Sequence, residues 1–504
     1  MPRPNQLILG FSLLKFLFHF LIAAFAGYEI FRDELYYLAC VDHLAWGYID
    51  QPPLSIWVLK AFTSILGDSI LSIRLIPAIA GGLSMYFLGK SVKELGGANF
   101  AIAVASLAYL ISPINLGFGS IYSMNCLDLL AWILSYYLVI RLIRTEDKKI
   151  WIYLGIVLGC ALMNKISILF LGAGLAIAIV ATPLRAWLKT PWPYIGGAIA
   201  LLSFTPYLWW NITHDMAHLE FIGNATSQKY DELSAWSFLS GQFLINHPTN
   251  FLIYLLGIFY FIFDQKGKKF RALGIIFFFT MLILMINGQS KSEYLAGAIS
   301  ILFGGGALWL EDRLNHLKWL KIAILILLVS GMALAPLAAP MLNETSFIRY
   351  SQKLGIGGSN NEGKEESELP QFYADMHGWE QKAKAVSLAF QNLSMEEKKH
   401  TIIFTQNYGR AGSMDYFNKK YDLPPSYSGH NNYWLWGPPP EETTTVIFLQ
   451  QQIGGAADLF ETIEEVGKIQ CEYCMPYENN LKVFIARNPN QSIGTLWPEL
   501  KNYN

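Results

Sequence analysis

Long apolar runs recur through about the first two thirds of the chain and stop near residue 340. A helix needs roughly 20 apolar residues to cross the hydrocarbon core of a bilayer. The pattern contains eleven candidate spans, at about 7–28, 71–92, 98–115, 124–143, 150–164, 166–183, 192–211, 249–264, 272–288, 294–310 and 319–338. Asn164 and Lys165 interrupt one long stretch, so 150–183 is either two short spans or one broken helix. The pattern predicts a polytopic α-helical membrane protein of about 11 spans.

The pattern changes in the last part of the chain, which reads as soluble. A Gly/Ser/Glu-rich segment at 355–368 predicts a surface loop. A helix-like stretch follows it, and short β-rich runs then appear at 401–405, 444–449 and 482–486. Such runs are typical of strands buried in an α/β sheet. We therefore expect two domains: a transmembrane domain, residues 1–340, and a small α/β domain, residues 341–504.

Lysine and arginine are distributed unevenly between the two sides of the predicted membrane domain. Loops on the side of the N-terminus carry 16 of these residues, whereas loops on the other side carry 6 before residue 341. Cytoplasmic loops are the Lys/Arg-rich ones. This distribution predicts an N-terminus inside the cytoplasm, and eleven spans then place the C-terminal domain outside it.

Composition agrees with a membrane protein and excludes a nucleic-acid binder. The chain is 53% hydrophobic and only 15% charged, with mean hydropathy +0.32, whereas soluble domains carry about a quarter charged residues. Its net charge of −1 provides no overall field that would favour nucleic acid. We expect membrane lipid, and no nucleic acid, among its partners.

Acidic residues gather in the first predicted outer loop, at about 29–70. Asp33 and Glu34 lie just beyond the first span, and the stretch from Glu34 to Trp46 is readable as an amphipathic helix lying along the interface. Asp50 precedes Gln51-Pro52-Pro53, and the two prolines hold the chain in an extended conformation. Acids at a membrane are costly and usually functional. The alternative is a set of solvated loop acids.

Three further charged residues map to the same outer face. Asp128 lies near the outer start of the fourth predicted span, where it could instead form a polar pair between helices. Lys165 and Lys291 are cations on a face that has few of them. They either reach toward the membrane surface or neutralise a phosphate group.

The C-terminal domain contains a Cys-x-x-Cys motif at Cys471 and Cys474. In an oxidising compartment outside the cytoplasm this motif predicts a disulfide. The alternatives are a redox site and half of a zinc site whose other ligands are not evident in the sequence.

Several motifs occur in a fixed order along the chain: D-E-x-x-Y at 33–37, D-Q-P-P-L at 50–54, M-N-x-x-D at 124–128 and K-S-E-Y-L at 291–295. Together they resemble those of GT-C glycosyltransferases. The similarity is to the bacterial branch related to protein O-mannosyltransferases, the lipid A aminoarabinose transferase and the rhizobial lipopolysaccharide galacturonosyltransferases. The tail segments at 372–380, 407–415 and 428–438 resemble soluble-domain blocks of one bacterial subgroup.

The resemblance implies a role for each motif. Asp33 would be the catalytic acid and Asp50 the second acid, with Glu34 and Asp128 in support. Gln51 stands where the aminoarabinose branch has a lysine associated with the donor phosphate. Lys165, Lys291 and Tyr294 would then face that phosphate, together with Gln51. The chain would belong to the bacterial inner membrane.

A lipid-phosphate sugar needs no acid for its leaving group, because phosphate departs as a stabilised anion. What remains is removal of the acceptor's proton, which one carboxylate can perform. The expected activity is therefore inverting transfer of a sugar from a polyprenyl-phosphate donor to a glycan, lipid A or protein acceptor. A divalent metal is compatible with this chemistry, but no ligand cluster requires one. The alternatives are a transporter or flippase of lipid-linked saccharide and a membrane-anchored assembly protein.

The aromatic residues of the tail have two interpretations. Tyr433, Trp434 and Trp436 form either the core of the domain, which we favour, or a platform for stacking a sugar. The neighbouring segment 430–432 provides polar groups for an acceptor or for turns.

Overall fold

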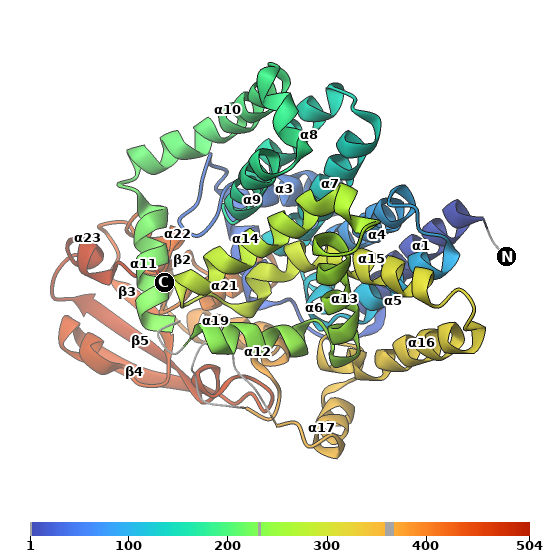
Figure 1. The fold of residues 1–504 in the computed structure, drawn as a ribbon. Helices are drawn as coiled ribbons and strands as arrows, with labels where there is room; N and C mark the ends of the chain where they lie inside the picture. The colour runs from blue at the N-terminus through green and yellow to red at the C-terminus, as the bar shows by residue number, and fades with distance from the viewer. Residues whose placement is uncertain (1–2, 230–232, 358–366) are drawn as a thin grey trace.

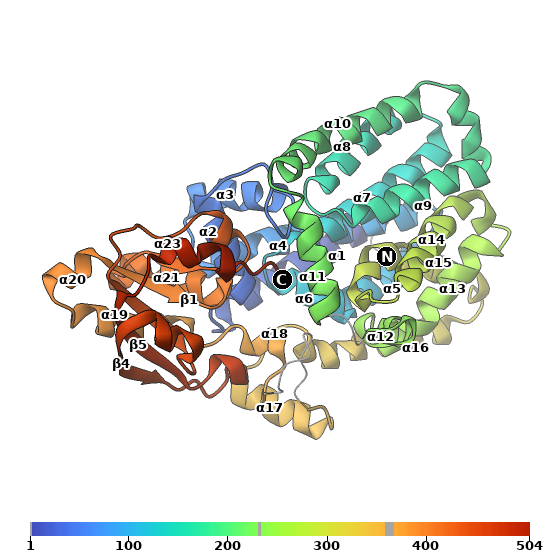
Figure 2. The same cartoon turned by 90° about the vertical axis from the view of Figure 1, so that its left-hand side faces the viewer.

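The structure is a computed structural model that describes residues 3–229, 233–357 and 367–504. Most of the loop predicted at 355–368 therefore lies outside the described residues. Figures 1 and 2 show a large helical part with a small sheet-containing domain at one end. The helices of the large part are α1 (Pro4–Phe25), α2 (Arg32–Asp42), α3 (Leu54–Leu66), α4 (Ile70–Glu94), α5 (Asn99–Ile111), α6 (Pro113–Ser120), α7 (Met124–Thr145), α8 (Lys149–Leu162), α9 (Ile168–Ala181), α10 (Trp192–Thr213), α11 (Ala217–Lys229), α12 (Ala235–Ile245), α13 (Phe251–Ile262), α14 (Arg271–Asn287), α15 (Ala296–Arg313) and α16 (Lys318–Gly331).

Each predicted span coincides with a helix of this part. Within the described ranges, six helices are long and apolar enough to cross a membrane, and the number is up to nine if each of three bent helix pairs forms one span. The stretch at 150–183 forms two helices, α8 and α9, separated by a non-helical break that contains Lys165. The chain is thus a multi-pass membrane protein, while the number of eleven spans stays a prediction.

Small residues bring the central helices into close contact. Helix α15 is buried along most of its length. A Cβ added to Gly257 of α13 would collide with the backbone of Leu302, and one added to Gly306 would collide with that of Ile253. Such close approach is typical of helix packing in membranes, where van der Waals contact replaces the hydrophobic effect as the driving force. Helices α1 and α16 instead expose apolar side chains, which suits lipid.

The C-terminal domain is built around a five-stranded mixed sheet with strand order β2-β1-β3-β5-β4. Strands β2 and β3 run parallel to β1, whereas β5 runs antiparallel to both β3 and β4. The strands are β1 (Thr401–Thr405), β2 (Ser426–Ser428), β3 (Thr445–Gln450), β4 (Phe460–Ile469) and β5 (Leu481–Pro489). Helices α19 (Trp379–Gln391) and α21 (Tyr408–Tyr421) pack with it, so the predicted small α/β fold is confirmed.

Helix α2 lies between the two parts, side by side with α21 (Figure 2). Two glycines of α21 permit this contact, because a Cβ on Gly409 would meet Arg32 Cγ at 2.6 Å and one on Gly412 would meet the backbone of Leu35 at 3.0 Å. The residues from Glu34 to Val41 are all buried as a result. The sequence predicted an amphipathic helix from Glu34 to Trp46 that lies along the interface. The helix in the structure is shorter, since α2 ends at Asp42, and it packs against α21.

Candidate functional site

Asp33 lies in the first turn of α2, at the junction with the C-terminal domain. Its Oδ1 accepts a hydrogen bond of 2.8 Å from the hydroxyl of Tyr408, the first residue of α21. The guanidinium of Arg32 lies 3.6 Å from the same oxygen. The carboxylate side chain remains 37% exposed, so it is both anchored and accessible.

Asp50 is tied to the same junction through tyrosines. The hydroxyl of Tyr36 lies 2.9 Å from Asp50 Oδ1 and 3.2 Å from Asn432 Oδ1. The ring of Tyr36 packs against that of Tyr408, with 4.8 Å between centroids. Asn432 Oδ1 also accepts a hydrogen bond from the backbone N–H of Ile49, which fixes the chain just before Asp50. The C-terminal domain therefore holds both candidate acids.

Tyr37, the tyrosine of the D-E-x-x-Y motif, lies within the electrostatic reach of both acids. Burial raises its pKa well above the ordinary value, and the charges of Asp50 and Asp33 add to the rise. Its hydroxyl accepts a hydrogen bond from the backbone N–H of Met124, at the start of α7. The structure thus brings Asp33 and Asp50 together around two buried phenols that stay protonated.

Glu34 faces the interior and forms a buried ion pair. Its carboxylate pairs with the guanidinium of Arg74 on α4, with a shortest distance of 2.9 Å, and both side chains are almost entirely buried. It also accepts hydrogen bonds from the backbone N–H groups of Phe31 and Tyr122. Glu34 therefore fixes the start of α2, and with it the position of Asp33.

A second polar cluster forms around Lys165, in the break between α8 and α9. Lys165 Nζ donates to Asn125 Oδ1 at 2.7 Å and lies 3.9 Å from Asp128 Oδ2. The ammonium group also lies over the ring of Tyr294, 5.4 Å from its centroid. Three predicted site residues that lie far apart in the sequence, Asp128, Lys165 and Tyr294, thus meet in space.

The two other predicted phosphate ligands, Lys291 and Gln51, each contact a residue close to them in the sequence. Lys291 Nζ lies 3.9 Å from Glu293 Oε1, in the segment that leads to Tyr294. Gln51 is buried, and its Oε1 accepts from the hydroxyl of Ser55. Its Nε2 amide has no hydrogen-bond partner among the residues that the structure describes. Over the same residues, no group of three or more His, Cys, Asp or Glu side chains is placed to hold a metal ion.

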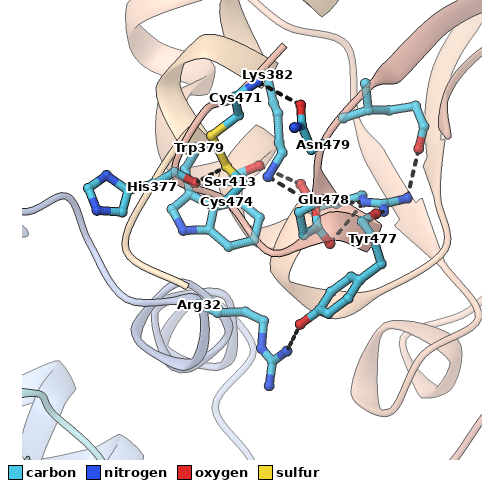
Figure 3. A network of polar contacts seen from close by, with 12 residues as sticks. Arg32, His377, Trp379, Lys382, Ser413, Cys471, Cys474, Tyr477, Glu478 and Asn479 are labelled. Carbon is cyan, nitrogen blue, oxygen red and sulfur yellow. Dashed lines mark hydrogen bonds and ion pairs between the residues drawn. A yellow bond between two sulfur atoms is a disulfide. The ribbon is translucent and has the colours of Figure 1, made fainter. Parts of the chain in front are cut away.

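A buried ion-pair network around Glu478 lies close to the start of α21 (Figure 3). Glu478 Oε2 lies 2.9 Å from Lys382 Nζ and 3.0 Å from Arg410 Nε. Burial alone would raise the pKa of Glu478, but the charges of Arg410 and Lys382 lower it to about 2. Asn407 donates to Glu478 Oε1 and caps α21 by accepting from the backbone N–H of Arg410. The network therefore fixes the N-terminus of α21, where Tyr408 lies.

The Cys-x-x-Cys pair lies beside this network. Cys471 and Cys474 form a disulfide, and the backbone N–H of Cys471 donates to Asn479 Oδ1 (Figure 3). The loop that the disulfide closes leads to Tyr477, whose hydroxyl accepts from Arg32 Nη1 at 3.0 Å. The disulfide thus belongs to the segment that contacts α2.

Sequence reasoning missed three residues of this site. Tyr36 occupies an unassigned position inside the D-E-x-x-Y motif, and Arg74 was counted only as an outer cation. Tyr408 lies in the tail segment 407–415, which resembles a soluble-domain block of other proteins but for whose residues no function was predicted. Of the tail aromatics, Tyr433 is buried, but in the cluster at the junction with α2 and not in the core around the sheet, and Trp434 and Trp436 are half-buried.

Comparison with known proteins agrees with this architecture. A family model described as dolichyl-phosphate-mannose-protein mannosyltransferase matches residues 50–210. Lipid A galacturonosyltransferase RgtD of Rhizobium johnstonii is 26% identical over 358 residues, which cover 67% of this chain and 71% of that protein.

Solved structures extend the likeness over nearly the whole chain. ArnT from Cupriavidus metallidurans, bound to undecaprenyl phosphate, matches with a TM-score of 0.58 at 12% identity, covering 95% of this chain and 97% of that one. The chain has the GT-C fold. Arabinofuranosyltransferase AftD from Mycobacteria matches with a TM-score of 0.55 at 12% identity, over 96% of this chain and 40% of that one. The GT-C fold predicted from the motifs is therefore confirmed, and the matched names support a glycosyltransferase.

Proposed function

We propose that this protein is an inverting glycosyltransferase that moves a sugar from a polyprenyl-phosphate carrier to an acceptor outside the cytoplasm. The observation that carries the proposal is the position of Asp33, an accessible carboxylate anchored by Tyr408 at the junction of the two parts. The undecaprenyl phosphate in the ArnT structure supports a carrier of the same chemical class for this chain.

Asp33 would act as the general base. Its Oδ1 is fixed by the hydroxyl of Tyr408, which leaves the other carboxylate oxygen to accept the acceptor's proton. The acceptor oxygen would attack the anomeric carbon as the phosphate leaves on the opposite side, so a single displacement inverts that centre. Asp50, fixed by Tyr36, would orient the acceptor.

The cluster around Lys165 would receive the donor phosphate. The leaving phosphate needs positive charge or N–H groups in place before the bond breaks. Lys165 and Tyr294 lie together at the break between α8 and α9, and Lys291 lies in the segment before Tyr294. Gln51 could add an amide donor. The N-terminus of α7 connects this cluster to Tyr37 and hence to the acids.

The central test replaces Asp33 with Asn. Asn keeps the size of the side chain and can still accept from Tyr408, but it cannot take a proton. Base catalysis is typically worth about 10²–10⁴-fold, so we expect a loss of that order in turnover with donor binding retained. Purified protein is incubated with polyprenyl-phosphate sugars and envelope extract. Asp42→Asn, at the exposed other end of α2, is the matched control. Transfer by Asp33→Asn at the wild-type rate would contradict the proposal.

The same proposal places the C-terminal domain outside the cytoplasm, as the Lys/Arg distribution predicts. A reporter that is active only in the cytoplasm, fused after Asn504, should give no signal. The same reporter fused in the loop between α7 and α8, near Asp147, should be active. A strong signal from the C-terminal fusion would overturn the orientation.

A further inference from the structure

A polar cavity opens on the side of Asp33 that faces the C-terminal domain. Its volume is ≈ 670 Å³, within the range of about 300–1,000 Å³ found for small-molecule sites. Two of its lining residues, Arg32 and Tyr408, also contact Asp33. A molecule bound in the cavity would therefore lie one side chain away from the candidate base.

Amide side chains dominate the lining. Seven of the twelve lining residues are Asn or Gln, among them Gln406, Asn407, Gln451 and Gln452. An amide offers both a donor and an acceptor, which matches the dual character of a sugar hydroxyl. Tyr408 and Tyr477 add aromatic rings to the same walls.

The charges at the cavity are already balanced. Arg410 donates through Nε to Glu478, through Nη1 to the carbonyl of Leu449 and through Nη2 to that of Tyr477. Arg32 is paired with Asp33 and Asp375. Among the described lining residues there is no Lys, Asp or Glu. A phosphate group is usually bound by Arg or Lys side chains that direct N–H groups at it, and these two guanidiniums are engaged with carboxylates instead.

The cavity also lies apart from the cluster that would hold the donor. Lys165 and Tyr294 contact each other beside the start of α7, where Met124 N–H donates to the hydroxyl of Tyr37, and neither of them lines the cavity. Arg32 and Tyr408 border the cavity from the side of α21. Asp33 therefore contacts two residues of the amide-lined cavity, whereas the cluster around Lys165 lies outside that cavity.

From this arrangement we propose that the cavity is the acceptor subsite and that it takes an uncharged glycan rather than a phosphorylated one. The proposal rests on the proposed glycosyltransferase function and names the class of its acceptor. Sugar hydroxyls bind the amides, and the acceptor hydroxyl nearest Tyr408 reaches Asp33.

The test measures binding without catalysis, so that its failure is distinct from failure of the proposed function. Full-length Asp33→Asn protein without donor is mixed with glycans released from bacterial envelopes and separated by anion exchange into a neutral and an anionic pool. Saturation-transfer NMR reports binding. Gln452→Trp fills the cavity from an exposed loop, and Gln491→Trp, an exposed loop glutamine of the same domain outside the cavity, is the matched control.

We expect the neutral pool to bind, the Gln452→Trp substitution to weaken that binding at least tenfold, and Gln491→Trp to leave it unchanged. In the active protein, Gln452→Trp should raise the acceptor KM without changing the donor KM. Preferential binding of the anionic pool would overturn the inference. Neutral-pool binding that is absent, or that is unaffected by Gln452→Trp, would overturn it as well. If the neutral pool binds but Asp33→Asn transfers sugar normally, the subsite stands and the catalytic assignment falls.

Discussion

The hydroxyl of Tyr408 donates a hydrogen bond to Asp33 across a sequence separation of 375 residues. Hydrogen bonds to charged groups contribute about 1.5–3 kcal/mol, so losing this one should misplace the carboxylate. We expect Tyr408→Phe to lower kcat about tenfold with little change in KM, because the ring still packs against that of Tyr36. Tyr416→Phe on the same helix, whose hydroxyl donates to the carbonyl of Asp68, is the control. Equal kcat values for the two variants would contradict a positioning role.

Lys165 should control donor affinity. We expect Lys165→Met to raise the donor KM at least tenfold and to leave the acceptor KM unchanged. Because this substitution leaves Asp128 without its cation, the double variant Lys165→Met with Asp128→Asn separates a folding defect from a binding defect. Recovery of donor affinity in the double variant would show that Lys165 acts only by neutralising Asp128.

Glu34→Gln should unfold the protein more readily. Removing one partner from a buried ion pair costs about 3–5 kcal/mol, because the other charge stays buried, and here Arg74 would remain. Melting temperature and activity should fall together, unlike the pure activity loss expected for Asp33→Asn. Glu465→Gln, which removes one partner of an exposed pair with Lys482, should cost less than about 1 kcal/mol. Wild-type stability of Glu34→Gln would contradict the structural role.

The buried carboxyl of Asp415 predicts a pH dependence of stability. Burial raises its pKa from 3.8 to about 6, although hydrogen bonds from Ser426 and Tyr433 oppose the rise. The fold therefore favours the protonated form of Asp415. The contribution of this carboxyl to the free energy of unfolding is complete below pH 3.8 and is lost as the pH rises through about 6. This rise in the pKa of Asp415 corresponds to roughly 3 kcal/mol.

Asp415→Asn should consequently narrow the difference in melting temperature between pH 4.5 and pH 8, compared with the wild type. Asp458→Asn, at an exposed position of the same domain, should leave that difference unchanged. An unaltered pH dependence in Asp415→Asn would contradict the assignment.

The disulfide should be present in protein isolated without reductant. The peptide that contains Cys471 and Cys474 should be about 2 Da lighter than its reduced form, as expected for an oxidising compartment. A Cys→Ser double variant should lose about 2 kcal/mol of stability, the value for closing so short a loop. Two thiols that react freely with an alkylating agent would contradict both the pairing and the compartment.

The sequence predicted those features that have a local pattern. Apolar runs located the helices, and the buried strands β1, β3 and β5 were found from their own residues. The edge strand β4 was missed because most of its side chains are exposed and several are charged, which hides the signal of a buried strand. The pairing of Glu34 with Arg74 spans 40 residues and has no local pattern at all. The site was predicted only as far as each of its residues lay in a recognisable motif.

The contact between Tyr408 and Asp33 also sets an order of events during synthesis. Chains grow at about 5–20 residues per second, so roughly 20–75 s separate the appearance of Asp33 from that of its partner 375 residues later. During this interval α2 has neither Tyr408 nor the backbone carbonyl of Asp375, which later accepts from Arg32 N–H. A nascent or truncated chain therefore carries its acids in an unassembled state. The contacts that Tyr408 and Asp375 make with α2 can therefore form only after the C-terminal domain has been synthesised and has packed against that helix.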